Sequence, residues 1–178
     1  MKHIYIPGFL DTAKYRKMIP GLEIWLEDID PKEKIETEYV VGHSMGADFA
    51  LINWDKNRNT KLILSNPILL KRNFFAWVAR WAKYLFTAEE KFPIGRWPTL
   101  LHPVLAIKRL FQLMNQDFDK ILSEVPRGHI IIVRGKEDKY LCCEETAEFI
   151  KNKGVNLIEV DGASHDWEDV KNEVLKIL

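Results

Sequence analysis

Short apolar runs recur along the chain, and each is followed by turn residues and then by a stretch with helical periodicity. In most runs apolar residues occupy successive positions instead of alternating with polar ones, which is typical of strands covered on both faces. The six runs are His3–Ile6, Leu22–Leu26, Tyr39–Val41, Lys61–Leu64, His129–Val133 and Asn156–Val160. This alternation of strands and helices predicts an α/β fold, with a mostly parallel six-stranded sheet flanked by helices.

One long interval, between Pro67 and Val125, contains no strand pattern. Its helical patterns lie at Asn73–Phe86, from Pro103 to about Asn115, and at Asp117–Ser123. The first of them places large apolar residues, several of them aromatic, on one helical face. Proline fits the first turn of a helix, so Pro103 is expected to open the second. We interpret this interval as a helical cap inserted at about residues 67–125 into a single domain that spans residues 1–178.

The sequence Gly42-His43-Ser44-Met45-Gly46 lies between a strand pattern and a helical pattern. Such a G-x-S-x-G turn holds its serine in a strained conformation that lifts the hydroxyl above the sheet. Glycine on either side removes side chains that would collide with neighbouring elements. The N-terminus of the following helix favours the negative charge that develops during acyl transfer. Ser44 is therefore the candidate nucleophile.

A serine hydroxyl is a weak nucleophile and needs a base that a third group orients. Among the five histidines, His165 follows the last strand in a loop of small residues that can carry an imidazole over the sheet edge. The others open strands, lie in the turn beside Ser44, or fall in the cap: His3, His129, His43 and His102. Asp138 and Glu137 both follow the strong strand Ile130–Val133, in the kind of turn where catalytic groups collect.

These motifs, in this order, resemble the α/β-hydrolase superfamily, in which the nucleophile precedes the acid and the acid precedes the histidine. In that family the acid follows its strand as G-x-x-D, which Gly135–Asp138 matches and Glu137 does not. The histidine closes a G-x-x-H loop, as in Gly162–His165. A strand ending in H-G or P-G contributes to the oxyanion hole, as Pro7-Gly8 would.

The resemblance covers the chain from Ile4 to His165, and it implies a catalytic triad of Ser44, Asp138 and His165. It also implies a minimal six-stranded sheet that lacks the family's first two strands. Asp48, in the first turn after Ser44, is interpreted as a carboxylate favoured by the helix dipole and not as the catalytic acid.

By the same resemblance, His165 removes the Ser44 proton as the hydroxyl attacks an acyl carbon, most simply that of a carboxylic ester. The backbone N–H groups of Met45 and Phe9 would hold the oxyanion, with Leu10 as an alternative to Phe9. Water then hydrolyses the acyl-enzyme, and no metal or organic cofactor is needed. Peptidases, thioesterases and acyltransferases use the same machinery, and a non-catalytic interaction module with this fold is a further alternative.

The composition bears mainly on partners and location. Lys+Arg and Asp+Glu both number 26, so a net charge of zero provides no general attraction to nucleic acid or to an anionic membrane. No apolar stretch is long enough to span a bilayer, and Pro7-Gly8 interrupts the N-terminal apolar run too early for a secretory signal. The only cysteines, Cys142 and Cys143, are expected to be reduced thiols and a poor metal site. We expect a cytoplasmic protein with a small-molecule acyl substrate, no nucleic acid and no stable membrane association; the sequence leaves its oligomeric state open.

The cap has three possible roles. It contains nine bases and five acids, which is a modest positive excess. It can be a lid that lines an acyl pocket, a helix on a membrane surface, or packing at the sheet edge. Large aromatic residues exposed together would form a patch that soluble monomers avoid. The prediction is therefore a lid whose Trp77 and Trp81 face Ser44 and bind the substrate.

Overall fold

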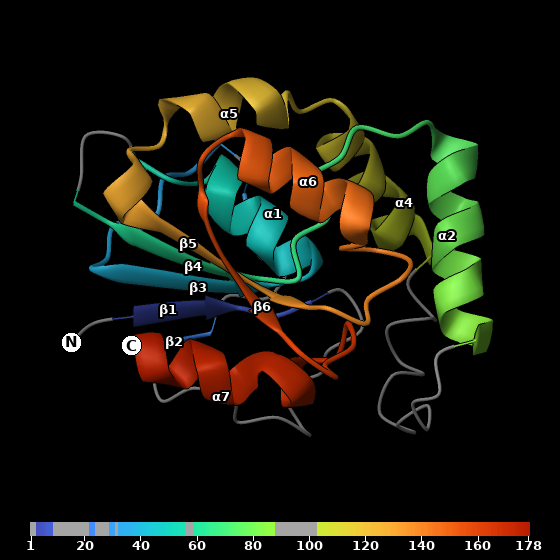
Figure 1. Cartoon of the computed structure of the whole chain (residues 1–178). Helices are drawn as coiled ribbons and strands as arrows, with labels where there is room; N and C mark the ends of the chain where they lie inside the picture. Colours follow the sequence, from blue (N-terminus) through green and yellow to red (C-terminus); the bar gives the residue numbers. More distant parts are fainter. Residues whose placement is uncertain (1–2, 9–21, 24–28, 31, 56–58, 88–102) are drawn as a thin grey trace.

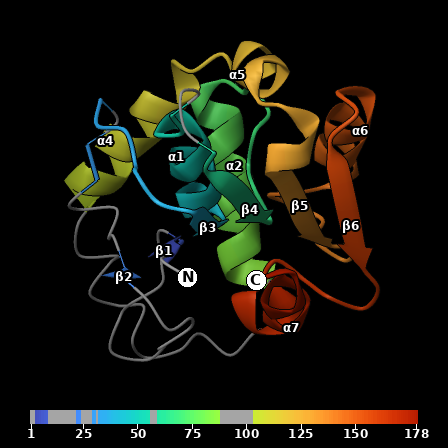
Figure 2. The same ribbon diagram turned by 90° about the vertical axis from the view of Figure 1, so that its left-hand side faces the viewer.

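The computed structural model describes residues 3–8, 22–23, 29–30, 32–55, 59–87 and 103–178. Its strands are β1 (His3–Ile6), β2 (Leu22–Glu23), β3 (Tyr39–His43), β4 (Lys61–Ser65), β5 (Ile130–Gly135) and β6 (Asn156–Val160). They form one sheet in the order β2-β1-β3-β4-β5-β6, and every neighbouring pair is parallel. The predicted six-stranded, mostly parallel sheet is confirmed, and Figure 2 shows β2 and β6 at its opposite edges.

The α-helices are α1 (Met45–Ile52), α2 (Phe74–Thr87), α4 (Pro103–Met114), α5 (Phe118–Glu124), α6 (Glu144–Asn152) and α7 (Trp167–Ile177). In Figure 1, α1, α5 and α6 cover one face of the sheet, and α7 covers the other. Helix α2 stands at the end of the sheet toward which the β1 arrow points. Three of these helices, α2, α4 and α5, fall in the interval predicted as a cap, within one residue or two of the expected bounds. Their description as an insertion in a single domain stays a prediction.

The strands are apolar at successive positions because both faces of the sheet are buried. Val40 and Leu62 belong to the larger core, which is shared with the helices on the α1 side. Their neighbours Val41 and Ile63 point the other way, into a smaller core with Trp167 of α7. Alternate residues of a strand point to opposite faces, so two apolar layers require an unbroken apolar run.

Some strand limits differ from the expected ones. His129 lies in a short 3-10 turn (Arg127–His129), and β5 begins one residue later, at Ile130. The polar residues His43 and Ser65 extend β3 and β4, because they pair with each other across the ladder. Residues 24–26 of the second predicted strand lie outside the described residues. Because His43 pairs with Ser65, β3 and β4 end at the same level of the sheet, and Ser44 and Asn66 are the first residues beyond these two ends.

Candidate active site

Ser44 occupies the sharp turn between β3 and α1. Its backbone angles are φ 53° and ψ −126°, the strained conformation expected for this turn. Its backbone N–H donates to the carbonyl oxygen of Ser65, at 2.8 Å. A Cβ atom on Gly42 would come within 2.5 Å of Ala47 Cα, and one on Gly46 would collide with the carbonyl oxygens of Ile6 and Pro7. Both glycines are therefore required by close backbone approach, as the motif predicts.

The structure joins Ser44, His165 and Asp138 in one hydrogen-bonded chain, although they are far apart in the sequence. Ser44 Oγ lies 2.8 Å from His165 Nε2, and His165 Nδ1 lies 2.5 Å from Asp138 Oδ2. All three residues are buried. Beside an ionised Asp138, Nδ1 carries the proton and donates it, so that Nε2 is left to accept the serine hydroxyl. The adjacent Glu137 is exposed, and its backbone N–H donates to the carbonyl oxygen of Ala163. Of the two acids, Asp138 is therefore the one whose carboxylate contacts the histidine.

The loop after β5 is folded around the Asp138 carboxylate. Its oxygens accept backbone N–H groups from Tyr140 (3.1 Å), Leu141 (3.0 Å) and Cys142 (2.8 Å). Burial alone would raise the pKa of Asp138, but the charge and hydrogen bond of His165 and these backbone donors outweigh it and lower the pKa to about 2. Asp138 therefore stays ionised at any pH where His165 can act as a base.

Met45 is the first residue of α1, so its backbone N–H belongs to the helix N-terminus next to Ser44. The second predicted oxyanion donor, Phe9, and its alternative Leu10 lie outside the described residues. The segment that leads to them is described, and the carbonyl oxygens of Ile6 and Pro7 lie against Gly46. The expected oxyanion strand thus lies against the Ser44 turn.

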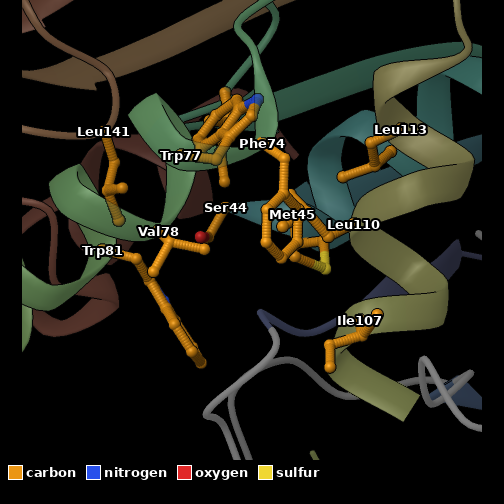
Figure 3. A pocket seen from close by; sticks show the side chains of 11 residues that line it. Ser44, Met45, Phe74, Trp77, Val78, Trp81, Ile107, Leu110, Leu113 and Leu141 are labelled. Atoms are coloured by element: carbon orange, nitrogen blue, oxygen red, sulfur yellow. The ribbon is translucent and has the colours of Figure 1, made fainter. Parts of the chain in front are cut away.

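An apolar cavity of about 100 Å³ lies between Ser44 and the cap. Figure 3 shows its walls: Trp77, Val78 and Trp81 come from α2, and Ile107, Leu110 and Leu113 come from α4. The two tryptophans named from the sequence therefore line the same cavity as the serine. Phe75, on the same helix, is 81% exposed and is not part of this wall.

Tyr84 also lies at the site, although no motif in the sequence marks it. Its ring is buried and meets the His165 ring edge-on, with the ring centroids 5.3 Å apart. It follows Trp77 and Trp81 at spacings of seven and three residues, which place all three on one helical face. Helical periodicity was therefore the signal that could have found it. Helix α2 covers His165 as well as the cavity.

Asp48 takes no part in the chain from Ser44 to Asp138. It lies in the first turn of α1, is buried, and its oxygens accept the Ile68 backbone N–H at 3.0 and 3.3 Å. Burial raises the pKa of Asp48 well above its usual value, although the Ile68 N–H and Arg72 act in the opposite direction. The carboxyl thus attaches the start of the cap segment to α1.

Cys142 and Cys143 are free thiols, as expected. In the part of the chain that the structure describes, no group of three or more His, Cys, Asp or Glu residues is placed to hold a metal ion. None of the described helices is long and apolar enough to cross a membrane. The cytoplasmic location stays a prediction.

No family model matches the chain, and no curated protein matches it. Several solved structures do. An α/β-hydrolase enzyme, MGS-MChE2, from the metagenome of sediments of the Mar Chica lagoon in Morocco is 14% identical, with a TM-score of 0.61 over 99% of this chain and 88% of that chain. A serine hydrolase involved in carbazole degradation, the CarC enzyme, is 15% identical, with a TM-score of 0.60 over 99% and 90%. The thioesterase domain from the curacin biosynthetic pathway is 12% identical, with a TM-score of 0.58 over 98% and 89%. These similarities, together with the topology above, show that the chain has the α/β-hydrolase fold.

Proposed function

We propose that this protein is a serine hydrolase that cleaves carboxylic esters with a small apolar acyl group through an acyl-enzyme on Ser44. The observation that carries the proposal is the hydrogen-bonded chain Ser44–His165–Asp138, whose serine opens into an apolar cavity. A nucleophile, a base and a buried carboxylate that orients the base are the three parts that acyl transfer to serine requires.

In the proposed reaction, His165 Nε2 accepts the hydroxyl proton while Ser44 Oγ bonds to the ester carbonyl carbon. The negative oxygen of the tetrahedral intermediate accepts a hydrogen bond from the Met45 N–H, with Phe9 as the second donor that the sequence predicts. When the intermediate collapses, the bond to the leaving oxygen breaks and His165 gives its proton to the departing alcohol. Water then attacks the acyl-enzyme with His165 again as the base, and it releases the carboxylic acid and restores Ser44.

Asp138 stays ionised throughout these steps. Its charge holds the imidazole with Nδ1 protonated and stabilises the imidazolium that forms twice per turnover. Three backbone N–H donors keep this carboxylate in place when the histidine charge disappears. The carboxylate therefore need not reorganise during the reaction.

The lining and the volume of the cavity support the proposal that the acyl group is small and apolar. Ten of its eleven lining residues are apolar, and Ser44 is the exception. An apolar cavity of about 150 Å³ holds a molecule the size of benzene, so about 100 Å³ suits a short chain. Thioesterases and peptidases use the same machinery, and preference for a thioester or an amide is an outcome of the test below.

The test combines a serine-directed phosphonate probe with a substrate panel. We expect mass spectrometry to find the phosphonate on Ser44 alone, and short-chain esters to be hydrolysed faster than matched thioesters and peptides. Label on another residue, or none on folded protein, would contradict the serine mechanism. Preference for a thioester or a peptide would keep the mechanism and change the substrate class.

A further inference from the structure

Asn66 is, after Ser44, the only non-glycine residue with a positive φ among those that the structure describes, at 46°. It follows the last residue of β4 and is fully buried. Asparagine tolerates the left-handed region better than other residues with a Cβ, yet the conformation still has a cost. Strained residues of this kind persist where the surroundings fix them, and they gather at functional sites.

The side chain of Asn66 connects the two loops that carry His165 and Asp138. Its Nδ2 donates to the carbonyl oxygens of His165 (2.9 Å) and Ser164 (3.2 Å). Its Oδ1 accepts the backbone N–H of Gly135, at 2.8 Å. The carbonyl oxygen of Gly135 in turn accepts the backbone N–H of Asp138, at 3.2 Å. One amide therefore lies a single hydrogen bond from His165 and two from Asp138.

The backbone around Asn66 completes this junction. Its own N–H donates to Val133 on β5, at 2.9 Å, and the carbonyl of the preceding Ser65 accepts the Ser44 N–H. A Cβ atom on Gly135 would collide with the carbonyl oxygen of Ser164, so the histidine loop lies directly on the end of β5. The segment Ser65–Asn66 thus contacts the main chain of all three loops of the proposed site.

We infer that Asn66 is a positioning residue that sets the distance between the His165 loop and the Asp138 loop. The inference rests on the proposed function, because Asn66 acts only through the proposed roles of His165 and Asp138 and has no chemical role of its own. The contacts of His165 Nδ1 with Asp138 and of His165 Nε2 with Ser44 must both persist while the imidazole gains and loses a proton. The two ends of the Asn66 amide hold the two loops at the spacing that satisfies both contacts.

The main test is Asn66→Gly, which removes the amide and leaves a residue that adopts a positive φ freely. A misplacement of about 1 Å in a catalytic group can cost on the order of a hundredfold in rate. We expect kcat per active site, counted with the phosphonate probe, to fall about 10- to 100-fold while KM changes less than about threefold. The acidic limb of the pH profile should also move to lower pH, because a displaced Asp138 stabilises the imidazolium less.

Asn66→Asp separates the two ends of the amide and serves as the second variant if Asn66→Gly does not fold. It keeps the oxygen that accepts the Gly135 N–H, but an ionised carboxylate cannot donate to the carbonyls of Ser164 and His165. We expect kcat to fall as in Asn66→Gly, and the acidic limb of the pH profile to differ from that of the wild type. The reason is that the His165 loop loses its hydrogen bonds to the side chain at position 66.

Asn53 provides the matched control. It is also fully buried, and its Nδ2 also donates to two backbone carbonyls, those of Asp30 (2.6 Å) and Glu33 (2.5 Å), which belong to no loop of the site. Asn53→Gly should lower the melting temperature and leave kcat and the pH profile unchanged. If the Asn66 variants behave like Asn53→Gly, the inference is wrong and Asn66 is structural only. If wild-type protein hydrolyses no acyl substrate, the proposed function itself fails.

Discussion

On the sheet side of the cavity the groups of the proposed reaction are polar and held by backbone hydrogen bonds, whereas the cap side consists of apolar side chains. Ser44 is tied to Ser65, and Asp138 accepts three backbone N–H groups. Opposite them, Trp77 and Trp81 contribute surface and packing. Hydrogen bonds weaken steeply with angle and distance, while apolar burial scales with area. Substitutions of the catalytic groups proposed on the sheet side should therefore lower kcat strongly, whereas substitutions on the cap side should change the preference for acyl chain length.

The largest effect is expected at Ser44. Ser44→Ala removes the nucleophile and should lower kcat by about 10⁴- to 10⁶-fold, with the melting temperature close to that of the wild type. The matched control is Ser123→Ala, because Ser123 lies on α5 and its hydroxyl donates to the Asp119 carbonyl, away from the site. Steady-state kinetics on a short-chain ester measure both variants. Comparable activity in Ser44→Ala and wild type would contradict the proposed nucleophile.

The two neighbouring acids should differ by several orders of magnitude. Asp138→Asn removes the charge that orients His165 and should lower kcat by up to about 10⁴-fold. Glu137→Gln changes an exposed side chain and should leave kcat within about twofold. The pH profile adds a second readout. If His165 is the base, as proposed, the acidic limb of the profile should vanish in His165→Ala. The opposite ranking of the two acids would mean that Glu137 is the orienting carboxylate.

Asp138 and Glu137 also show how much of the site can be predicted from the sequence. The strands and the order of the motifs follow from local patterns, because strand residues covered on both faces must be apolar and a serine turn must be flanked by glycine. The choice of Asp138 over Glu137 needed a family resemblance, because adjacent side chains in a turn look alike until the backbone folds around one of them. Asn66 had no signal in the sequence, because its partners are main-chain groups of loops almost 70 and 100 residues away.

The free energy of unfolding should depend on pH through Asp138 on the sheet side of the cavity, and not through the apolar residues on the cap side. The pKa of Asp138 is about 2 in the folded chain, below its usual 3.8, so the unfolded chain binds the proton more tightly. Its stabilisation is present above pH 4 and is lost as the pH falls through about 2. The difference in free energy of unfolding between wild type and Asp138→Asn should therefore shrink by on the order of 2 kcal/mol between pH 5 and pH 2.

Urea unfolding at the two pH values measures this difference. Trp77→Ala provides the control on the cap side, since a variant that changes no titratable group should lower the free energy of unfolding by about the same amount at both. If the gap between wild type and Asp138→Asn is equally wide at pH 5 and pH 2, the carboxylate does not have its lowered pKa.

The smallest effect, and the most informative for the substrate, concerns the cap. Each methylene that enters an apolar site contributes about 0.8 kcal/mol, or about fourfold in kcat/KM, until the cavity is full. Trp77→Ala or Trp81→Ala enlarges the cavity and should move the optimum to longer acyl chains. Reaction with an acetyl ester should change little, because so small a group does not reach the cap. Initial rates on a series of ester chain lengths give the profile.

Phe75→Ala is the control that distinguishes the lid from the two other roles of the cap. Phe75 lies on the same helix as the two tryptophans but is 81% exposed, so a lid predicts an unchanged chain-length profile. A membrane-surface helix predicts that wild type binds anionic vesicles and that Phe75→Ala weakens this binding more than either tryptophan variant does. Plain packing predicts lower stability in the tryptophan variants, an unaltered profile and no vesicle binding. Only a lid shifts the profile in Trp77→Ala and Trp81→Ala while Phe75→Ala keeps it, since only there does the apolar wall meet the acyl chain.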